Sequence, residues 1–264
     1  MHKAIILGCG AATGVPAMMN EWGSCNQNNP KNRRTRAGSY VEFVKAKILI
    51  DTSADLRLQY LQNNLRELDG VLYTHAHADH IMGIDDLRSV TQYMNHYLNI
   101  YADTDTIDEL VKRFGYVFIT QKSNQLTHRP HLFPNIVKPL KSFFISDVEI
   151  TPFTLTGHTV NTTGYCFNTG ELVVMSDFKS VPEETLLFLS KINVNVLIIP
   201  LTLLRNGKYH AGMDIVLGYI QKIKPEKVIF THMGVDCDYD NVNAITPDNC
   251  FAGYDGMIVD LEKK

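Results

Sequence analysis

Paired cysteines are missing from this chain of 264 residues. The five cysteines are odd in number, and no two of them form a CxxC pair; they are Cys9, Cys25, Cys166, Cys237 and Cys250. This spacing argues against a disulfide framework and against a cysteine-rich zinc site. It fits a protein of the reducing cytoplasm.

Long apolar runs and a charge excess are missing as well. No run approaches the roughly 20 apolar residues of a membrane span, since Pro200 interrupts Val196–Leu204 and Ala4–Leu7 is too short for a signal peptide. The 25 basic and 28 acidic side chains give a net charge of -3, which disfavours a strongly basic nucleic-acid binder. We expect a cytoplasmic protein without a membrane partner, and nucleic acid is a disfavoured partner.

Apolar runs alternate with helical spacings along the whole chain. The runs predict strands at Lys3–Leu7, Tyr40–Val44, Ile48–Ile50, Gly70–Tyr73, Ile145–Phe153, Gly164–Asn168, Leu172–Met175, Val194–Ile199 and Lys227–Phe230. The spacings predict helices at Ala54–Asn64, Asp105–Phe114, Pro182–Ser190 and Met213–Lys222. No linker divides the chain, and each half supplies strands followed by helices. We therefore expect one α/β domain over residues 1–264, built from two related layers.

Two segments lack this periodicity. Residues 11–38 are rich in Gly, Asn and Pro, and we expect a long surface loop, a kind of segment that is more often functional than idle. Its cations could neutralise a substrate phosphate or simply face solvent; they are Lys31, Arg33, Arg34 and Arg36. Residues 121–140 contain three prolines and are expected to form a variable insert.

Four potential metal ligands follow the predicted strand Gly70–Tyr73 in the run His75-Ala-His77-Ala-Asp79-His80. His75 and His77 are two residues apart and can grip one ion from an extended segment, whereas Asp79 and His80 can face a neighbouring site. Three of the chain's ten histidines fall within these six positions. This clustering favours a metal site over a histidine-rich surface loop, and imidazole ligands suit zinc, manganese or iron.

Six residues cannot complete the coordination of two ions, so further ligands should follow other strands. Three polar residues stand where an apolar run opens into a loop: His158, Asp177 and His232. Each alone could be a capping or surface residue. Together with the first cluster, they are expected to be metal ligands.

In their order along the chain, these seven positions resemble the HxHxDH motif and the later ligands of the metallo-β-lactamase superfamily. The resemblance covers nearly the whole chain and implies a four-layer αβ/βα sandwich, with two mixed sheets flanked by helices and the metals at one edge. It implies that one metal is bound by His75, His77 and His158. It implies a second metal bound by Asp79, His80 and His232, with Asp177 bridging the two.

Shorter motifs resemble the PhnP-like branch, which includes phosphodiesterases acting on cyclic ribosyl phosphates; they are Gly8-Cys9-Gly10, Gly14-Val15-Pro16, Asn29–Arg36, Asp86-Leu87-Arg88, Thr231-His232-Met233 and Tyr254–Met257. Those enzymes carry an extra histidine on a loop before the last strand, and His210 matches it. The best-studied type also holds a structural zinc with three close cysteines and a histidine. Here that region offers only Cys25 and Val235, so we expect no structural zinc.

The resemblance implies a hydrolase of small cyclic or nucleotide-like phosphodiesters with two divalent ions, zinc or manganese, with iron as an alternative. Two such ions can share a hydroxide, make it available near neutral pH and hold the phosphate oxygens. His210 is the candidate general acid for the leaving oxygen, because histidine titrates near neutral pH. Asp79 is expected both to bind a metal and to orient the attacking water. A homodimer is compatible with the sequence.

Other functions stay open at this point. A nuclease resembling ribonuclease Z should carry a basic arm, yet the insert 121–140 contributes only Lys122, Arg129 and Lys138. A thioester hydrolase of the same fold, resembling the glyoxalases, is a further alternative. The second-metal residues Asp79 and His80 argue against a mononuclear iron dioxygenase, and the intact ligand set argues against a non-catalytic metal sensor.

Overall fold

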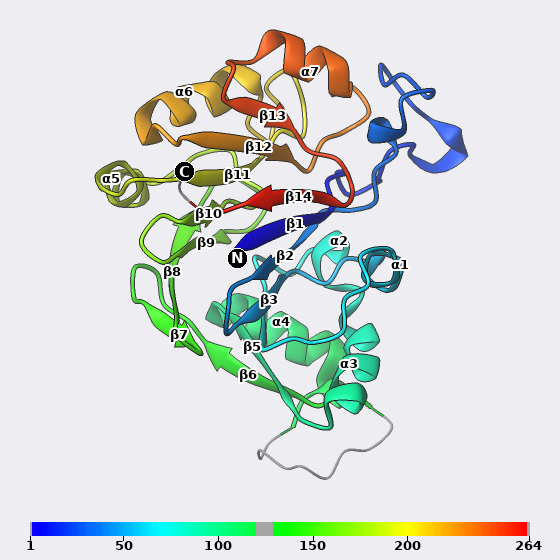
Figure 1. The fold of residues 1–264 in the computed structure, drawn as a ribbon, viewed down its shortest axis with the longest axis vertical. Coiled ribbons are helices and arrows are strands. Elements are labelled where there is room, and N and C mark those ends of the chain that lie inside the picture. The colour runs from blue at the N-terminus through cyan, green and yellow to red at the C-terminus, as the bar shows by residue number, and fades with distance from the viewer. Residues whose placement is uncertain (1, 120–128, 263–264) are drawn as a thin grey trace.

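The computed structural model describes residues 2–119 and 129–262, and two seven-stranded sheets lie face to face at its centre (Figure 1). The first sheet has the order β14 (Met257–Asp260), β1 (Lys3–Gly8), β2 (Gly38–Glu42), β3 (Lys47–Ile50), β4 (Gly70–Leu72), β5 (Leu98–Ala102), β6 (Leu132–Ile136). The second has the order β13 (Cys250–Ala252), β12 (Lys227–Thr231), β11 (Val196–Pro200), β10 (Leu172–Val174), β9 (Thr162–Phe167), β8 (Val148–Leu155), β7 (Phe143–Ile145). Both sheets mix parallel and antiparallel pairs.

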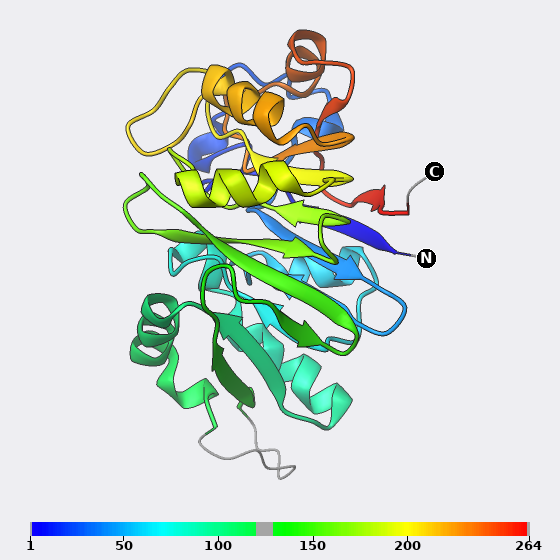
Figure 2. The ribbon, with the colours of Figure 1, turned by 90° about the vertical axis from the view of Figure 1, so that its left-hand side faces the viewer.

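Helices cover the two outer faces, as Figures 1 and 2 show. The first sheet is covered by α1 (Leu56–Gln62), α2 (Ala78–Ile81), α3 (Leu87–Met94) and α4 (Thr104–Phe114). The second is covered by α5 (Glu183–Lys191), α6 (Met213–Ile223) and α7 (Tyr239–Ile245). These layers confirm the four-layer α/β sandwich expected from the sequence. None of the helices in the described ranges has the length and apolarity to cross a membrane.

Side chains of the first sheet alternate between two cores. In β1, Ala4 and Ile6 face the second sheet, whereas Ile5 and Leu7 pack under the helices. Successive side chains of a strand point to opposite faces, so a strand buried on both sides must be apolar throughout. This is why β1 appears in the sequence as a continuous apolar run. All five cysteines are buried, free thiols.

Two sequence predictions were wrong in detail. The predicted strand Ile145–Phe153 is two strands, β7 and β8, joined through Ser146 and Asp147. Ser146 has a φ of 54°, the left-handed backbone that such tight hairpin turns require. Part of the expected insert 121–140 forms β6, an edge strand in which a proline is tolerated. Residues 120–128 of that insert, with Lys122, lie outside the described residues.

The topology brings the loops that follow several strands to one edge of the sandwich. Strands β10, β11 and β12 are parallel, and two antiparallel steps through β9 give β8 the same direction. Their carboxyl ends therefore meet at one edge. The loop between β1 and β2 projects at the right of Figure 1. It packs on the segment after β12, where Gly10 forms a bridge with Met233 and the Ser24 amide donates to the Val235 carbonyl.

Candidate metal centre

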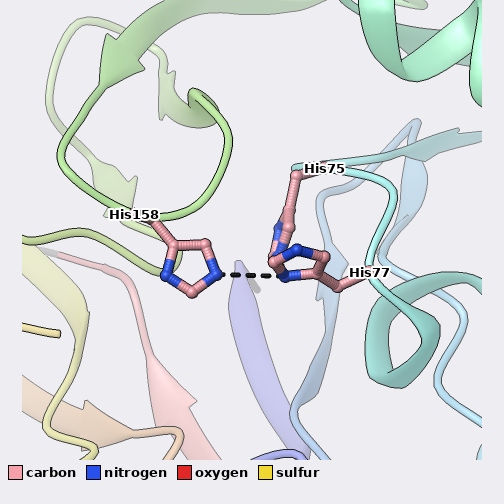
Figure 3. A group of neighbouring side chains, drawn as sticks. All are labelled: His75, His77 and His158. Atoms are coloured by element: carbon pink, nitrogen blue, oxygen red, sulfur yellow. Dashed lines mark hydrogen bonds between the residues drawn. The ribbon is translucent and has the colours of Figure 1, made fainter. Parts of the chain in front are cut away.

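Three histidines from two segments converge on one point (Figure 3). His75 and His77 follow β4, and His158 follows β8. Nδ1 of His77 lies 2.9 Å from Nε2 of His75 and 3.0 Å from Nε2 of His158. Ligands of a tetrahedral metal with nitrogen at 2.0–2.1 Å lie about 3.3 Å apart. The three nitrogens are thus spaced close to what one such ion requires.

A second group lies beside the first and contains Asp79, His80, Asp177 and His232. Oδ2 of Asp79 is 3.3 Å from Nε2 of His80 and 3.2 Å from Nε2 of His232. The Asp177 carboxylate reaches both groups, because one oxygen lies 3.4 Å from Nε2 of His232 and the other 3.8 Å from Nε2 of His158. The structure therefore brings together all seven residues selected from the sequence.

The other nitrogen of each histidine is hydrogen-bonded to the protein. Nδ1 of His80 contacts the Asp51 carboxylate at 2.7 Å, and Nδ1 of His75 contacts the Thr74 hydroxyl at 3.0 Å. The remaining three contacts join His77 to the Thr159 hydroxyl, His158 to the Tyr209 carbonyl and His232 to the Thr202 hydroxyl. Such partners fix the orientation and tautomer of a metal-binding imidazole. These outer partners were not found from the sequence.

The inner atoms fit divalent metal ions. Nε2 of His80 and Oδ1 of Asp177 are buried, and neither has a hydrogen-bond partner within the described residues. Buried polar atoms are normally hydrogen-bonded, so two orphaned atoms within one group of potential ligands fit a bound cation. A donor set of imidazole nitrogens and carboxylate oxygens suits zinc, manganese or iron.

The electrostatics of the group also favour a cation. Burial alone would raise the pKa of Asp79, but the neighbouring imidazoles of His232 and His80 outweigh it and hold that pKa below its usual range. Burial would lower the pKa of His80, yet Asp51 and Asp79 raise it well above the usual value. The buried carboxylates thus require positive charge, which a divalent ion can supply in place of a proton.

His210 lies next to both groups, on the loop between β11 and α6. One of its ring nitrogens lies within 4.8 Å of ligand atoms of His158 and Asp177. Burial lowers its pKa, and the neighbouring His232 and His158 rings lower it further against the opposing effect of Asp177. The ring is therefore mostly neutral near pH 7 and carries one N–H. The structure thus places His210 beside both candidate ligand groups.

The cations of the loop 11–38 are occupied within the protein. Arg34 is buried, and its guanidinium donates to the carbonyls of Gly234 and Cys237. Arg36 forms an ion pair with Asp55. Lys31 donates to the hydroxyl of Tyr239 and Arg33 stacks on Trp22. Arg34, expected on a surface loop, instead fixes that loop to the segment after His232, because its planar fork can serve several acceptors at once.

A family model described as the beta-lactamase superfamily domain matches residues 46–233. The chain belongs to this superfamily. Solved structures agree with this fold. The crystal structure of a diphosphatase from the PhnP family is 25% identical, with a TM-score of 0.87 over 99% of this chain and 98% of that one. The short form of human tRNase Z is 13% identical, with a TM-score of 0.69 over 99% of this chain and 100% of that one.

Among curated relatives of this superfamily member, a Porphyromonas gingivalis protein named octanoyltransferase is 28% identical over 99% of this chain and 52% of its own length. Ribonuclease Z of Bradyrhizobium diazoefficiens is 31% identical over 87 residues, which are 31% of this chain and 29% of that protein. The chain thus spans about half the length of the first relative, and the match to the second is shorter still.

Proposed function

We propose that this member of the hydrolase superfamily is a dinuclear metal-dependent phosphodiesterase that acts on small cyclic or nucleotide-like phosphodiesters. The observation that supports the proposal most strongly is the convergence of seven ligand side chains with orphaned inner atoms. The seven side chains form two groups that share the Asp177 carboxylate, an arrangement that suits two ions. Two adjacent ions suit the hydrolysis of phosphate esters.

In this proposal, one ion is held by His75, His77 and His158. The other is held by Asp79, His80 and His232, and Asp177 is shared between them. When bound, the metals would supply a water nucleophile at neutral pH and polarise the phosphoryl oxygens. Asp79, whose carboxylate contacts His80 and His232, would also orient the attacking water.

His210 would serve the leaving oxygen. In its neutral form, the ring donates a hydrogen bond through its single N–H. Full proton transfer draws on the protonated fraction, which grows as pH falls toward the lowered pKa of this group. His210 has ring contacts with both His158 and His232, one from each group, so the proposal assigns it to the leaving group of a substrate bound by both ions.

A small substrate is favoured over RNA because three of the four cations of the loop 11–38, Lys31, Arg34 and Arg36, are already engaged. A polyanion binder needs free Lys and Arg side chains along its groove, whereas Arg34 is buried and Arg36 is paired with Asp55. The similarity to a PhnP-family diphosphatase over nearly the full length also supports a small phosphate substrate. The relative named octanoyltransferase is about twice as long as this chain, so its name does not decide the activity of the matching part. We keep thioester hydrolysis as the alternative activity.

The test is a substrate panel with zinc, manganese or iron(II) supplied in turn. It contains bis(p-nitrophenyl) phosphate, a 2′,3′-cyclic nucleotide, p-nitrophenyl phosphate, a short RNA and an octanoyl thioester. We expect the diesters to be hydrolysed faster than the monoester. His77→Ala should abolish turnover, while His96→Ala, a change at an exposed histidine away from the site, should not. Faster turnover of the monoester, the RNA or the thioester than of any small diester would overturn the proposal.

A further inference from the structure

One hydroxyl group touches two functionally different histidines. Thr202 lies just after β11, and its Oγ1 is 3.1 Å from Nδ1 of His232 and 3.3 Å from Nδ1 of His210. The two imidazole rings are stacked on each other, with centroids 5.9 Å apart and planes 23° from parallel. Thr202 therefore contacts a candidate metal ligand and the candidate proton donor at once.

The hydrogen-bonding capacity of Thr202, His210 and His232 determines which group is the donor in each contact. A hydroxyl has one hydrogen and can accept through its oxygen. Nε2 of His232 faces the carboxylates of Asp79 and Asp177, so with a metal bound there its remaining hydrogen must sit on Nδ1 and point at Thr202. The hydroxyl hydrogen is then free for its other neighbour, Nδ1 of His210. That nitrogen can accept it only if the His210 hydrogen is on Nε2.

We propose that Thr202 is a positioning residue that holds His210 in its Nε2–H tautomer when the Asp79–His80–His232 group is loaded. In this tautomer the N–H of His210 is on Nε2, the ring nitrogen that does not contact Thr202. That this N–H then serves the leaving oxygen rests on the proposed function. Without metal, His232 is free to change tautomer, and the chain of hydrogen bonds loses its direction. Metal binding and the orientation of the proton donor are thereby coupled through a single hydroxyl.

Other polar atoms near His210 in the described residues do not hydrogen-bond its ring, including the Asp177 carboxylate, which lies within 4.8 Å of one ring nitrogen. Nζ of Lys179 contacts the backbone carbonyls of Gly207 and His210 and so holds the loop. The Tyr209 carbonyl accepts from His158 and not from His210. Over the described part of the chain, Thr202 supplies the side-chain hydrogen bond that we find at this ring.

The test uses Thr202→Val, which keeps the shape of the side chain and removes the hydroxyl, and Thr202→Ser, which restores it. Thr159→Val is the matched control, because Thr159 also contacts the outer nitrogen of a candidate ligand, His77, but not His210. Two-bond ¹⁵N–¹H correlation spectra of the imidazoles report each tautomer, and a His210→Asn sample assigns the His210 signals. Spectra are recorded on zinc-loaded and zinc-free protein.

We expect a pure Nε2–H pattern for His210 in zinc-loaded wild type, Thr202→Ser and Thr159→Val. We expect a tautomer mixture in zinc-loaded Thr202→Val and in zinc-free wild type. At saturating zinc, Thr202→Val should slow a diester with an alkoxide leaving group by roughly 10-fold or more, and p-nitrophenolate release by much less, since that leaving group needs little help.

An Nδ1–H pattern in zinc-loaded wild type, or the same pattern in Thr202→Val as in wild type, would overturn the inference. If Thr202 only supports His232, Thr202→Val and Thr159→Val would both lose zinc affinity, and both would leave the His210 signals unchanged. The proposed function can fail separately. A protein that hydrolyses no phosphodiester but shows the Thr202-dependent tautomer would keep the positioning role and remove the phosphodiesterase.

Discussion

Asp51→Asn is the change that most directly tests how the candidate metal centre is held. The carboxylate of Asp51 is buried behind the second group. One oxygen contacts Nδ1 of His80 at 2.7 Å and the hydroxyl of Thr74 at 2.8 Å, and the other accepts from the Thr74 amide at 2.8 Å. Asp51 has a φ of 62°, a backbone conformation that asparagine tolerates far better than alanine. The substitution therefore removes charge and one acceptor with little change in shape.

The three contacts set the expected size of the effect. An amide keeps one oxygen, but its NH₂ cannot accept from the His80 ring or from the Thr74 amide. One hydrogen bond to a charged group is lost, which is worth about 1.5–3 kcal/mol. This corresponds to roughly a 10- to 100-fold weaker metal affinity, the usual effect of removing such a partner. The larger loss should fall on the Asp79–His80–His232 group, because Asp51 contacts His80 directly but reaches His75 only through the Thr74 hydroxyl.

Competition with a chromophoric chelator for zinc resolves the two affinities. Asp55→Asn is the matched control, since Asp55 pairs with Arg36 away from the ligands and its loss should leave both affinities unchanged. Near-UV circular dichroism checks that the variant has kept its fold. Unchanged affinity at both sites in Asp51→Asn would refute the reasoning. An equal loss at both sites in a folded protein would show that the direct contact with His80 is not the main route by which Asp51 acts.

Three further predictions follow from the same geometry. Metal analysis should find two ions per wild-type chain and one in Asp79→Ala, and a single ion in both would contradict the assignment of the second group. His210→Ala should slow turnover of poor leaving groups by roughly 10²–10⁴-fold with unchanged metal content; loss of metal would instead make His210 a ligand. Arg34→Met should lower the free energy of unfolding by about 3 kcal/mol in urea denaturation, because buried carbonyl acceptors lose their donor. Wild-type stability of this variant would show that Arg34 is dispensable to the fold.

The sequence was most informative where the chemistry is local. His75, His77, Asp79 and His80 lie within six residues, and the remaining candidate ligands follow apolar runs. Strand periodicity and ligand chemistry were therefore enough to select all seven residues that the structure brings together. The two-layer α/β organisation followed from the same periodicity. The short turn between β7 and β8 was missed because an apolar run continues on both sides of it.

The supporting residues could not be predicted in the same way. Asp51 and Thr202 become neighbours of His80 and His232 only through strand pairing between distant segments. Nothing in their local sequence separates them from other polar residues at strand ends. Arg34 shows the converse problem, since a cation in a polar loop is normally solvated, and its burial depends on backbone carbonyls some 200 positions away.

Strand order nevertheless explains why His210 reaches the site. Parallel strand β11 lies between β10 and β12 in the second sheet. Asp177 follows β10 and His232 follows β12, so the loop that leaves the end of β11 must emerge between these two candidate ligands. Thr202 is the second residue of that loop, and His210 is carried back to the same place when the loop is fixed by Lys179. The strand order, and not the distance in sequence from His232, is therefore the physical reason to assign His210 to this site.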